Sequence, residues 1–180
     1  MRRLIYIRVI HSPVDFSNGI GFDVKKENFI NSFWDMAEKE LGRINLRYSQ
    51  TRLYQDGYCE DGKEIYAEME KRSADGSRNY KLILNLIKRG AKLMLTENEE
   101  LCDNFRLALC CEEEMAKIRR LRDKYIAKQI SQTLKDDETG ILIMGANHNV
   151  DDYLPKDIKV FYLKKSDEFL ANFLKRMPNL

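Results

Sequence analysis

The feature that most constrains this chain is a regular alternation of short extended segments with longer amphipathic ones. Extended segments of strand length, rich in apolar and β-branched residues, occur at 4–10, 46–54, 91–95, 141–144 and 158–163. Between them, apolar residues recur at the spacing of helices that pack one face on a sheet. Strands separated by helices pair in parallel through right-handed crossovers. The sequence therefore predicts an α/β fold, a three-layer sandwich with a mainly parallel sheet of about five strands flanked by helices.

Capping residues indicate where several of the helices begin. Stretches with helical periodicity follow three such residues, Asp23, Ser77 and Ser166. Thr96 and Glu99 have the spacing of a capping box, and the pattern after them extends to about residue 134 with one break near Cys110. A shorter helix is predicted over 64–71. No repeat or linker divides the chain, so we expect a single domain over 1–180.

The charge balance argues against some classes of partner. Apolar residues make up 43% of the chain and charged residues 33%, and the formal net charge is +2. A nucleic-acid-binding domain usually carries a larger and more clustered basic excess, so we expect no nucleic acid partner. No stretch approaches the roughly 20 apolar residues that span a bilayer, and Arg8 interrupts the first apolar run. We therefore expect a soluble, cytoplasmic protein without a membrane partner.

The cysteines form neither a metal-binding motif nor a disulfide framework. There are four of them, Cys59, Cys102, Cys110 and Cys111. A bond between the adjacent pair inside a helical stretch would be strained. We therefore predict reduced, mostly packed thiols. No histidine or basic motif lies near any of them in the sequence, which disfavours a thiol nucleophile.

Polar residues follow four of the predicted strands. His11 follows the first strand, Asp56 the second and Glu97 the third, while His148 comes shortly after Gly145 at the end of the fourth. Ligands of parallel α/β sheets bind outside the carboxyl ends of the strands. Both histidines and two acids thus converge on one edge, where they could form a hydrolase-like site.

Each of these residues also has a structural interpretation. A histidine after a strand can cap a turn, and Asp56 with Gly57 is a common turn pair. Glu97 precedes a predicted helix, where an acid is favoured by the helix dipole. For Asp56 and Glu97 both interpretations remain open, while two histidines at one edge favour a functional site.

Two short motifs and the first histidine resemble those of a known superfamily. One is an Arg-led helix that leads into the fourth strand, Arg122-Asp123-Lys124-Tyr125-Ile126-Ala127; the other directly follows that strand, Gly145-Ala146-Asn147-His148. With a histidine that ends the first strand, this order resembles the TraB/Tiki and EreA/ChaN-like superfamily, some of whose members are metal-dependent proteases or hydrolytic esterases. The resemblance covers the first strand and residues 122–150. Three residues before its histidine the family usually has Gly or Glu, where this chain has Arg8. Before the helix arginine the family often has Glu, where this chain has Leu121.

The resemblance implies a hydrolase that acts on a small-molecule or peptide substrate. In a metal-dependent form, His11, His148, Glu97 and Asp56 would hold a divalent ion such as Zn²⁺ or Mn²⁺, with one position open for water. Glu97 would be a ligand or a general base, and Arg122 would stabilise a developing oxyanion. In a metal-free form, His11 or His148 would be the base, oriented by an acid.

Competing interpretations exist for the other candidate residues. Arg122 lies in a charged helix, so it could equally be a solvated surface residue. Residues 75–79 open a helix and could bind an anion, although a simple cap also explains them. The rival function is a non-catalytic domain that binds a small polar or anionic ligand through Arg8, Arg78 and Arg122. A third interpretation is a shortened, inactive family member that acts as an interaction partner. The size of the chain would permit a homodimer.

Overall fold

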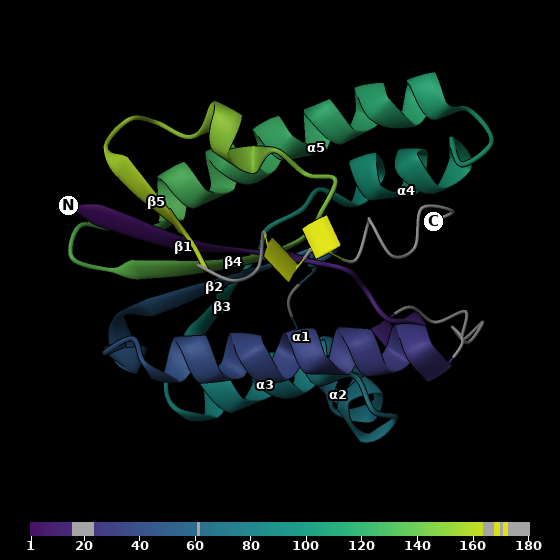
Figure 1. The fold of residues 1–180 in the computed structure, drawn as a ribbon. Helices are drawn as coiled ribbons and strands as arrows, with labels where there is room; N and C mark the ends of the chain where they lie inside the picture. Colours follow the sequence, from purple (N-terminus) through teal and green to yellow (C-terminus); the bar gives the residue numbers. More distant parts are fainter. Residues whose placement is uncertain (16–23, 61, 164–167, 170, 173–180) are drawn as a thin grey trace.

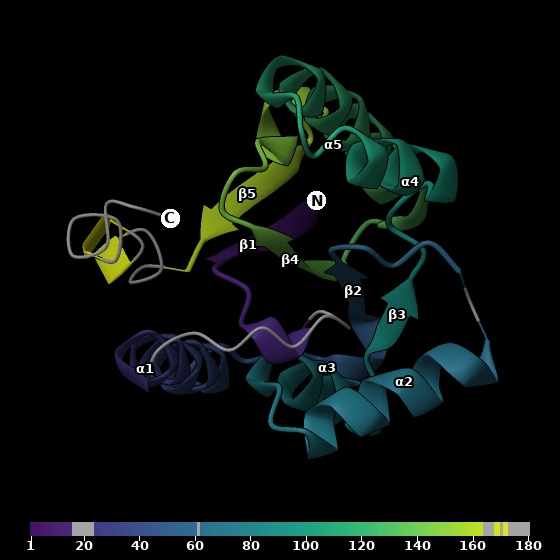
Figure 2. The ribbon, with the colours of Figure 1, turned by 90° about the vertical axis from the view of Figure 1, so that its right-hand side faces the viewer.

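The computed structural model describes residues 1–15, 24–60, 62–163, 168, 169, 171 and 172. Within these residues five strands form one sheet, in which every neighbouring pair is parallel. The strands are β1 (Arg2–Val9), β2 (Thr51–Gln55), β3 (Lys92–Met94), β4 (Thr139–Gly145) and β5 (Ile158–Tyr162). They lie side by side in the order β3-β2-β4-β1-β5 (Figure 2). The predicted α/β fold with a parallel sheet is confirmed.

Helices cover both faces of the sheet. On one face lie α1 (Val24–Gly42), α2 (Lys63–Ala74) and α3 (Arg78–Lys88), and on the other α4 (Glu99–Leu107) and α5 (Glu112–Thr133) (Figure 1). The sheet and its two helical layers therefore form the predicted three-layer sandwich.

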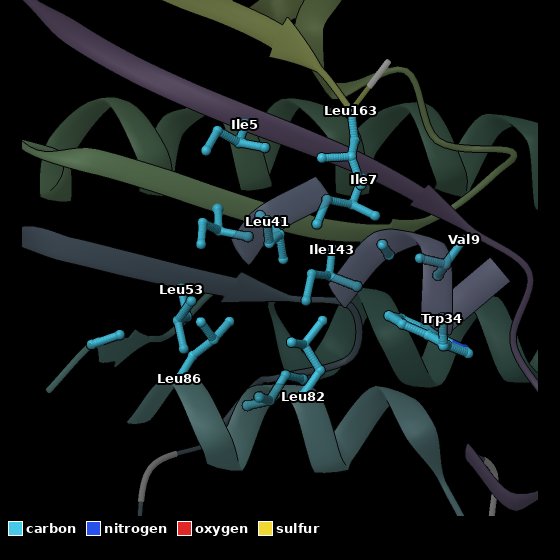
Figure 3. Packing of buried hydrophobic residues seen from close by; sticks show 14 of the residues in the cluster. Ile5, Ile7, Val9, Trp34, Leu41, Leu53, Leu82, Leu86, Ile143 and Leu163 are labelled. Carbon is cyan, nitrogen blue, oxygen red and sulfur yellow. The ribbon is translucent and has the colours of Figure 1, made fainter. Parts of the chain in front are cut away.

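Alternation along the strands gives each face its own apolar core. Ile5, Ile7 and Val9 of β1 pack into the cluster between the sheet and the helices α1 and α3 (Figure 3). Leu4 and Tyr6, from the same strand, belong to the second cluster, which packs against α5. This period of two is the expected pattern for a strand buried on both sides.

The central strand β4 is buried on both faces except at its last residue. Its partners are β1 on one side and β2 on the other, with Val9 opposite Gly145 and Gln55 opposite Ile143. Because the three strands are parallel and in this register, their carboxyl ends lie together at one edge of the sheet.

Several predicted boundaries change in the structure. The second strand is shorter than predicted, because Tyr48–Gln50 forms a 3₁₀ turn before β2. The long helix does break near Cys110, between α4 and α5. The prediction that Thr96 caps this helix is wrong: the Asn98 side chain accepts the N–H of Leu101 at 3.0 Å.

The Thr96 hydroxyl has another role. It accepts the N–H of Gln55 at 3.1 Å and donates to the carbonyl of Met94 at 2.9 Å. The side chain thus joins β2 to the end of β3 instead of satisfying the helix. The predicted cap Ser77 is confirmed, because its Oγ accepts the N–H of Tyr80 at 3.2 Å.

Two predicted caps, Asp23 and Ser166, lie outside the described residues, as does most of the predicted final helix. Among the described helices, none has the length and apolar character needed to cross a membrane.

Candidate functional site

The first pair at the carboxyl edge comes from the ends of β1 and β2. His11 Nε2 lies 3.1 Å from Asp56 Oδ2, and the backbone N–H of Gly145 donates to the same oxygen at 3.0 Å. Three neighbouring strands thus contribute to one contact. The Asp56–Gly57 turn is real, with Gly57 at a φ of 73°, but the Asp56 side chain points into the site as well.

His11 is held between two carboxylates. On the other side of its ring, Nδ1 lies 3.7 Å from Asp15 Oδ2. Burial alone disfavours a charged imidazole, but the hydrogen bonds and charges of Asp15 and Asp56 outweigh it and raise the pKa of His11 to about 9. At neutral pH His11 is therefore a cation, which suits it poorly to act as a base or as a metal ligand.

Arg122 is the second cation of the site, and it is buried, with only 7% of the residue exposed. Its Nε donates to Glu97 Oε2 at 3.0 Å, and its Nη2 donates to Glu97 Oε1 at 2.5 Å and to Asp56 Oδ1 at 3.0 Å. The guanidinium carbon lies 5.1 Å from the centre of the Phe105 ring. The interpretation of Arg122 as a solvated surface residue is therefore wrong.

The two carboxylates respond differently to this environment. Burial raises the pKa of Glu97 above its usual value, and the hydrogen bond from Arg122 offsets this only in part. Burial also disfavours ionised Asp56, but the hydrogen bond from His11 and the nearby positive charges hold the pKa of Asp56 well below its usual range. Of these two carboxylates, Asp56 is thus the one that stays ionised.

His148 forms a separate pair with Asp123 of α5. Its Nδ1 lies 2.5 Å from Asp123 Oδ1, while Asp123 Oδ2 accepts the N–H of Asn149 at 3.0 Å. The carbonyl of His148 accepts a hydrogen bond from the Tyr6 hydroxyl at 3.1 Å. The imidazole ring and the backbone of His148 are therefore both held in place. His148 Nε2 makes no hydrogen bond to any residue in the described part of the chain.

Residues from these ion pairs lie together in one cluster. Asp56, Glu97 and His148 each place one potential metal-ligand atom within 4.8 Å of the other two. Two carboxylates and an imidazole are a donor set that suits Zn²⁺ or Mn²⁺, so this group could hold a metal. His11 does not belong to the group.

The carboxylate oxygens of this group already accept hydrogen bonds. Both oxygens of Glu97 and one of Asp56 accept from Arg122, and the second oxygen of Asp56 contacts His11 and Gly145. A bound metal would therefore share these oxygens with Arg122, which already supplies a positive charge at the same place.

The three arginines proposed for anion binding do not converge. Arg78 pairs with Asp35 of α1, on the opposite helical layer from Arg122. Arg8 lies 3.6 Å from Asp151 and donates to Asn149 at 3.4 Å.

The helix start at residues 75–79 is a cap rather than a free anion site. Ser77 caps α3, and its hydroxyl also donates to the carboxylate of Asp15. The negative charge beside this helix start is therefore supplied by the chain itself.

Two important residues escaped prediction as site residues, Asp15 and Asp123. Asp123 stood within the helix motif that carries Arg122, and its position in that motif was the only available signal. Successive residues of a helix point about 100° apart, so which of them reaches His148 depends on how α5 packs.

The described residues also form an apolar hollow away from this cluster. It is lined by Arg8, Ile10, Phe29, Ile30, Phe33 and Phe169. Of the ion-paired residues, Arg8 lines it, whereas His11, Asp56, Glu97, Arg122 and His148 do not.

Comparisons with family models, curated proteins and solved structures found no match to this chain. The likeness to the TraB/Tiki and EreA/ChaN-like superfamily therefore remains a proposal, and the candidate site stands on its own geometry.

Proposed function

We propose that this protein is a hydrolase in which His148 is the general base and Asp123 orients it. The observation that carries the proposal is the 2.5 Å contact between His148 Nδ1 and the Asp123 carboxylate. An imidazole held in this way by a carboxylate keeps one tautomer and one orientation, and it leaves Nε2 to take a proton from water.

Arg122 would bind the negative charge that develops on the substrate. Its Nε and Nη2 are committed to Glu97 and Asp56, but no residue of the described chain accepts a hydrogen bond from Nη1. A fixed donor of this kind stabilises an oxyanion without having to reorganise. The substrate class that fits is an ester or amide of a small molecule or peptide.

The test is the rate of hydrolysis of a panel of chromogenic esters and short peptides. Asp123→Asn and His148→Asn should each lower kcat by at least about 100-fold, because both remove general-base catalysis. Asp152→Asn is the matched control, since Asp152 is an exposed acid near His148 in the sequence. Melting temperatures would establish that each variant is folded. Wild-type-like turnover by Asp123→Asn, or no turnover by the wild type across the panel, would contradict the proposal.

A second form of the proposal uses a divalent metal held by Asp56, Glu97 and His148. The compact cluster of their ligand atoms favours it. Such an ion would supply an acidified water. Elemental analysis of tag-free protein beside His148→Ala decides between the two forms. Near-stoichiometric zinc or manganese that is lost in the variant would favour the metal form, and no metal after reconstitution would favour the His148–Asp123 base.

A binding domain without catalysis is the rival function. The site contains four carboxylates, Asp15, Asp56, Glu97 and Asp123. Its two cations, His11 and Arg122, contact the first three, and Asp123 contacts His148. This excess of acid disfavours an anionic ligand. Stabilisation of the wild type by phosphorylated metabolites in a thermal-shift screen, without turnover, would support the rival.

A further inference from the structure

Cys59 and Cys102 lie together beside the ion-paired cluster. Their Sγ atoms are 3.4 Å apart, although 43 positions separate them in the sequence. Cys102 is buried in α4, whereas Cys59 is partly exposed in the loop after β2. The other two cysteines, Cys110 and Cys111, are exposed. The expectation of mostly packed thiols is therefore wrong for that adjacent pair.

Backbone hydrogen bonds hold the two thiols in this position. The carbonyl of Tyr58 accepts the N–H groups of both Thr96 and Glu97 at 3.0 Å, which joins the loop of Cys59 to the segment that leads into α4. A disulfide bond is about 2.05 Å long, so the sulfurs would have to approach by only about 1.4 Å. Side-chain rotation and a small shift of the exposed loop could provide this.

We propose that Cys59 and Cys102 are a modification site at which a low-molecular-weight disulfide forms a Cys59–Cys102 disulfide bond. The half-exposed thiol is the one that such a reagent can reach, and the buried thiol lies next to it. Neither cysteine belongs to the group of Asp56, Glu97 and His148 that could hold a metal. This inference does not depend on the proposed hydrolase activity.

The reaction proceeds by two thiol–disulfide exchanges. The Cys59 thiolate attacks one sulfur of the reagent, a mixed disulfide forms, and the first small thiolate leaves. The Cys102 sulfur then attacks the Cys59 sulfur, and the second small thiolate leaves. The protons of the two protein thiols pass to the released thiolates. Two protein thiols are thus oxidised and one reagent disulfide is reduced to two thiols.

Local electrostatics support Cys59 as the attacking group. When Cys59 loses its proton, the Cys102 S–H can donate to the Cys59 thiolate instead of to Glu97, and this lowers the pKa of Cys59 against the opposing effect of its burial. A larger thiolate fraction makes the partly exposed Cys59 sulfur the faster of the two to react.

The new bond would also change the candidate site. The Cys102 sulfur lies 3.7 Å from Glu97 Oε2 and is a hydrogen-bond donor to that carboxylate. A disulfide removes this donor and links the loop after Asp56 to the helix after Glu97. Oxidation therefore acts on the two segments that present the carboxylates to Arg122.

The experiment uses the full chain with Cys110→Ser and Cys111→Ser, so that only the proposed pair remains. The folded protein is treated with oxidised glutathione, alkylated, digested without reductant and analysed by mass spectrometry. We expect the loss of both free thiols, a linked 59–102 peptide pair without retained glutathione, and complete reversal by reductant.

Two further variants separate the roles of the sulfurs. In the same background, Cys102→Ser should retain one glutathione on Cys59. Cys59→Ser should leave Cys102 at least about 10-fold slower to react, because that thiol is buried. Glutathione retained on Cys59 of the parent without a 59–102 link would overturn the proposal, as would a link that forms only after denaturation. Both of these outcomes are measured on the parent protein, and neither measurement requires hydrolytic activity.

Discussion

The imidazole of His11 lies between the carboxylates of Asp15 and Asp56, and these carboxylates stabilise its positive charge in the folded state. An unfolded histidine has a pKa of about 6.5, and the folded pKa of His11 is about 9. Since the pKa is higher in the folded state, the stabilisation is fully present below pH 6.5. It declines as the pH rises and is lost above pH 9.

His11→Gln should therefore lower the free energy of unfolding most at acidic to neutral pH. A pKa difference of this size corresponds to about 3 kcal/mol near pH 6. The difference between wild type and variant should shrink toward zero as the pH passes 9. Urea unfolding of both proteins between about pH 6 and 10 measures it. A difference that stays constant over this range would show that the charge of His11 does not contribute.

Among the elements, β4 has little room for larger side chains. It lies between β1 and β2, and helices cover both of its faces. A Cβ atom at Gly140 would lie 2.6 Å from Leu4 Cδ1 and 3.3 Å from Tyr54 Cε2. Leu4 and Tyr54 are themselves fully buried, so neither side chain has free space to move into.

Gly140→Ala should destabilise the protein by about 1–3 kcal/mol, the usual range for overpacking a dense core. Gly42→Ala, at the end of α1, is the matched control, because nothing lies within 4 Å of its Cβ position. Chemical denaturation of the three proteins gives the comparison. Equal stability of the two variants would mean that the core around β4 adjusts without cost.

Across the whole molecule, Arg122 connects segments that are far apart in the sequence. From α5 it reaches Asp56 after β2 and Glu97 after β3. Removal of one partner from a buried ion pair leaves the other charges without compensation and typically costs about 3–5 kcal/mol.

Arg122→Met should therefore lower the free energy of unfolding by about 3–5 kcal/mol. In the double variant with Glu97→Gln the loss should be smaller than the sum of the single losses, because the two residues share one interaction. Arg106→Met is the control: Arg106 also pairs with an acid, Asp103, but its side chain is 71% exposed, and its loss should change stability by less than about 0.5 kcal/mol. Denaturant titration of the wild type, the three single variants and the double variant tests the scheme, and strict additivity would contradict it.

The sequence predicted part of the candidate site. His11, Asp56, Glu97 and His148 follow strands, and the parallel sheet brings them to one edge as expected. It did not predict that His11 would pair with Asp15 and lie outside the group of Asp56, Glu97 and His148 that could hold a metal. Nor did it reveal Asp123, whose side chain meets His148 only because α5 presents that side of the helix to the end of β4.

The sequence by itself determined the kind and order of the strands and of the helices up to about residue 134, because the periodicities of two and 3.6 residues are local properties of the chain. It also placed polar residues after the strands. Only the tertiary structure decided which charges meet and which thiols lie together. Those pairings depend on the strand order, the register of β4 and the rotation of α4 and α5, all of which are set by packing between residues distant in the sequence.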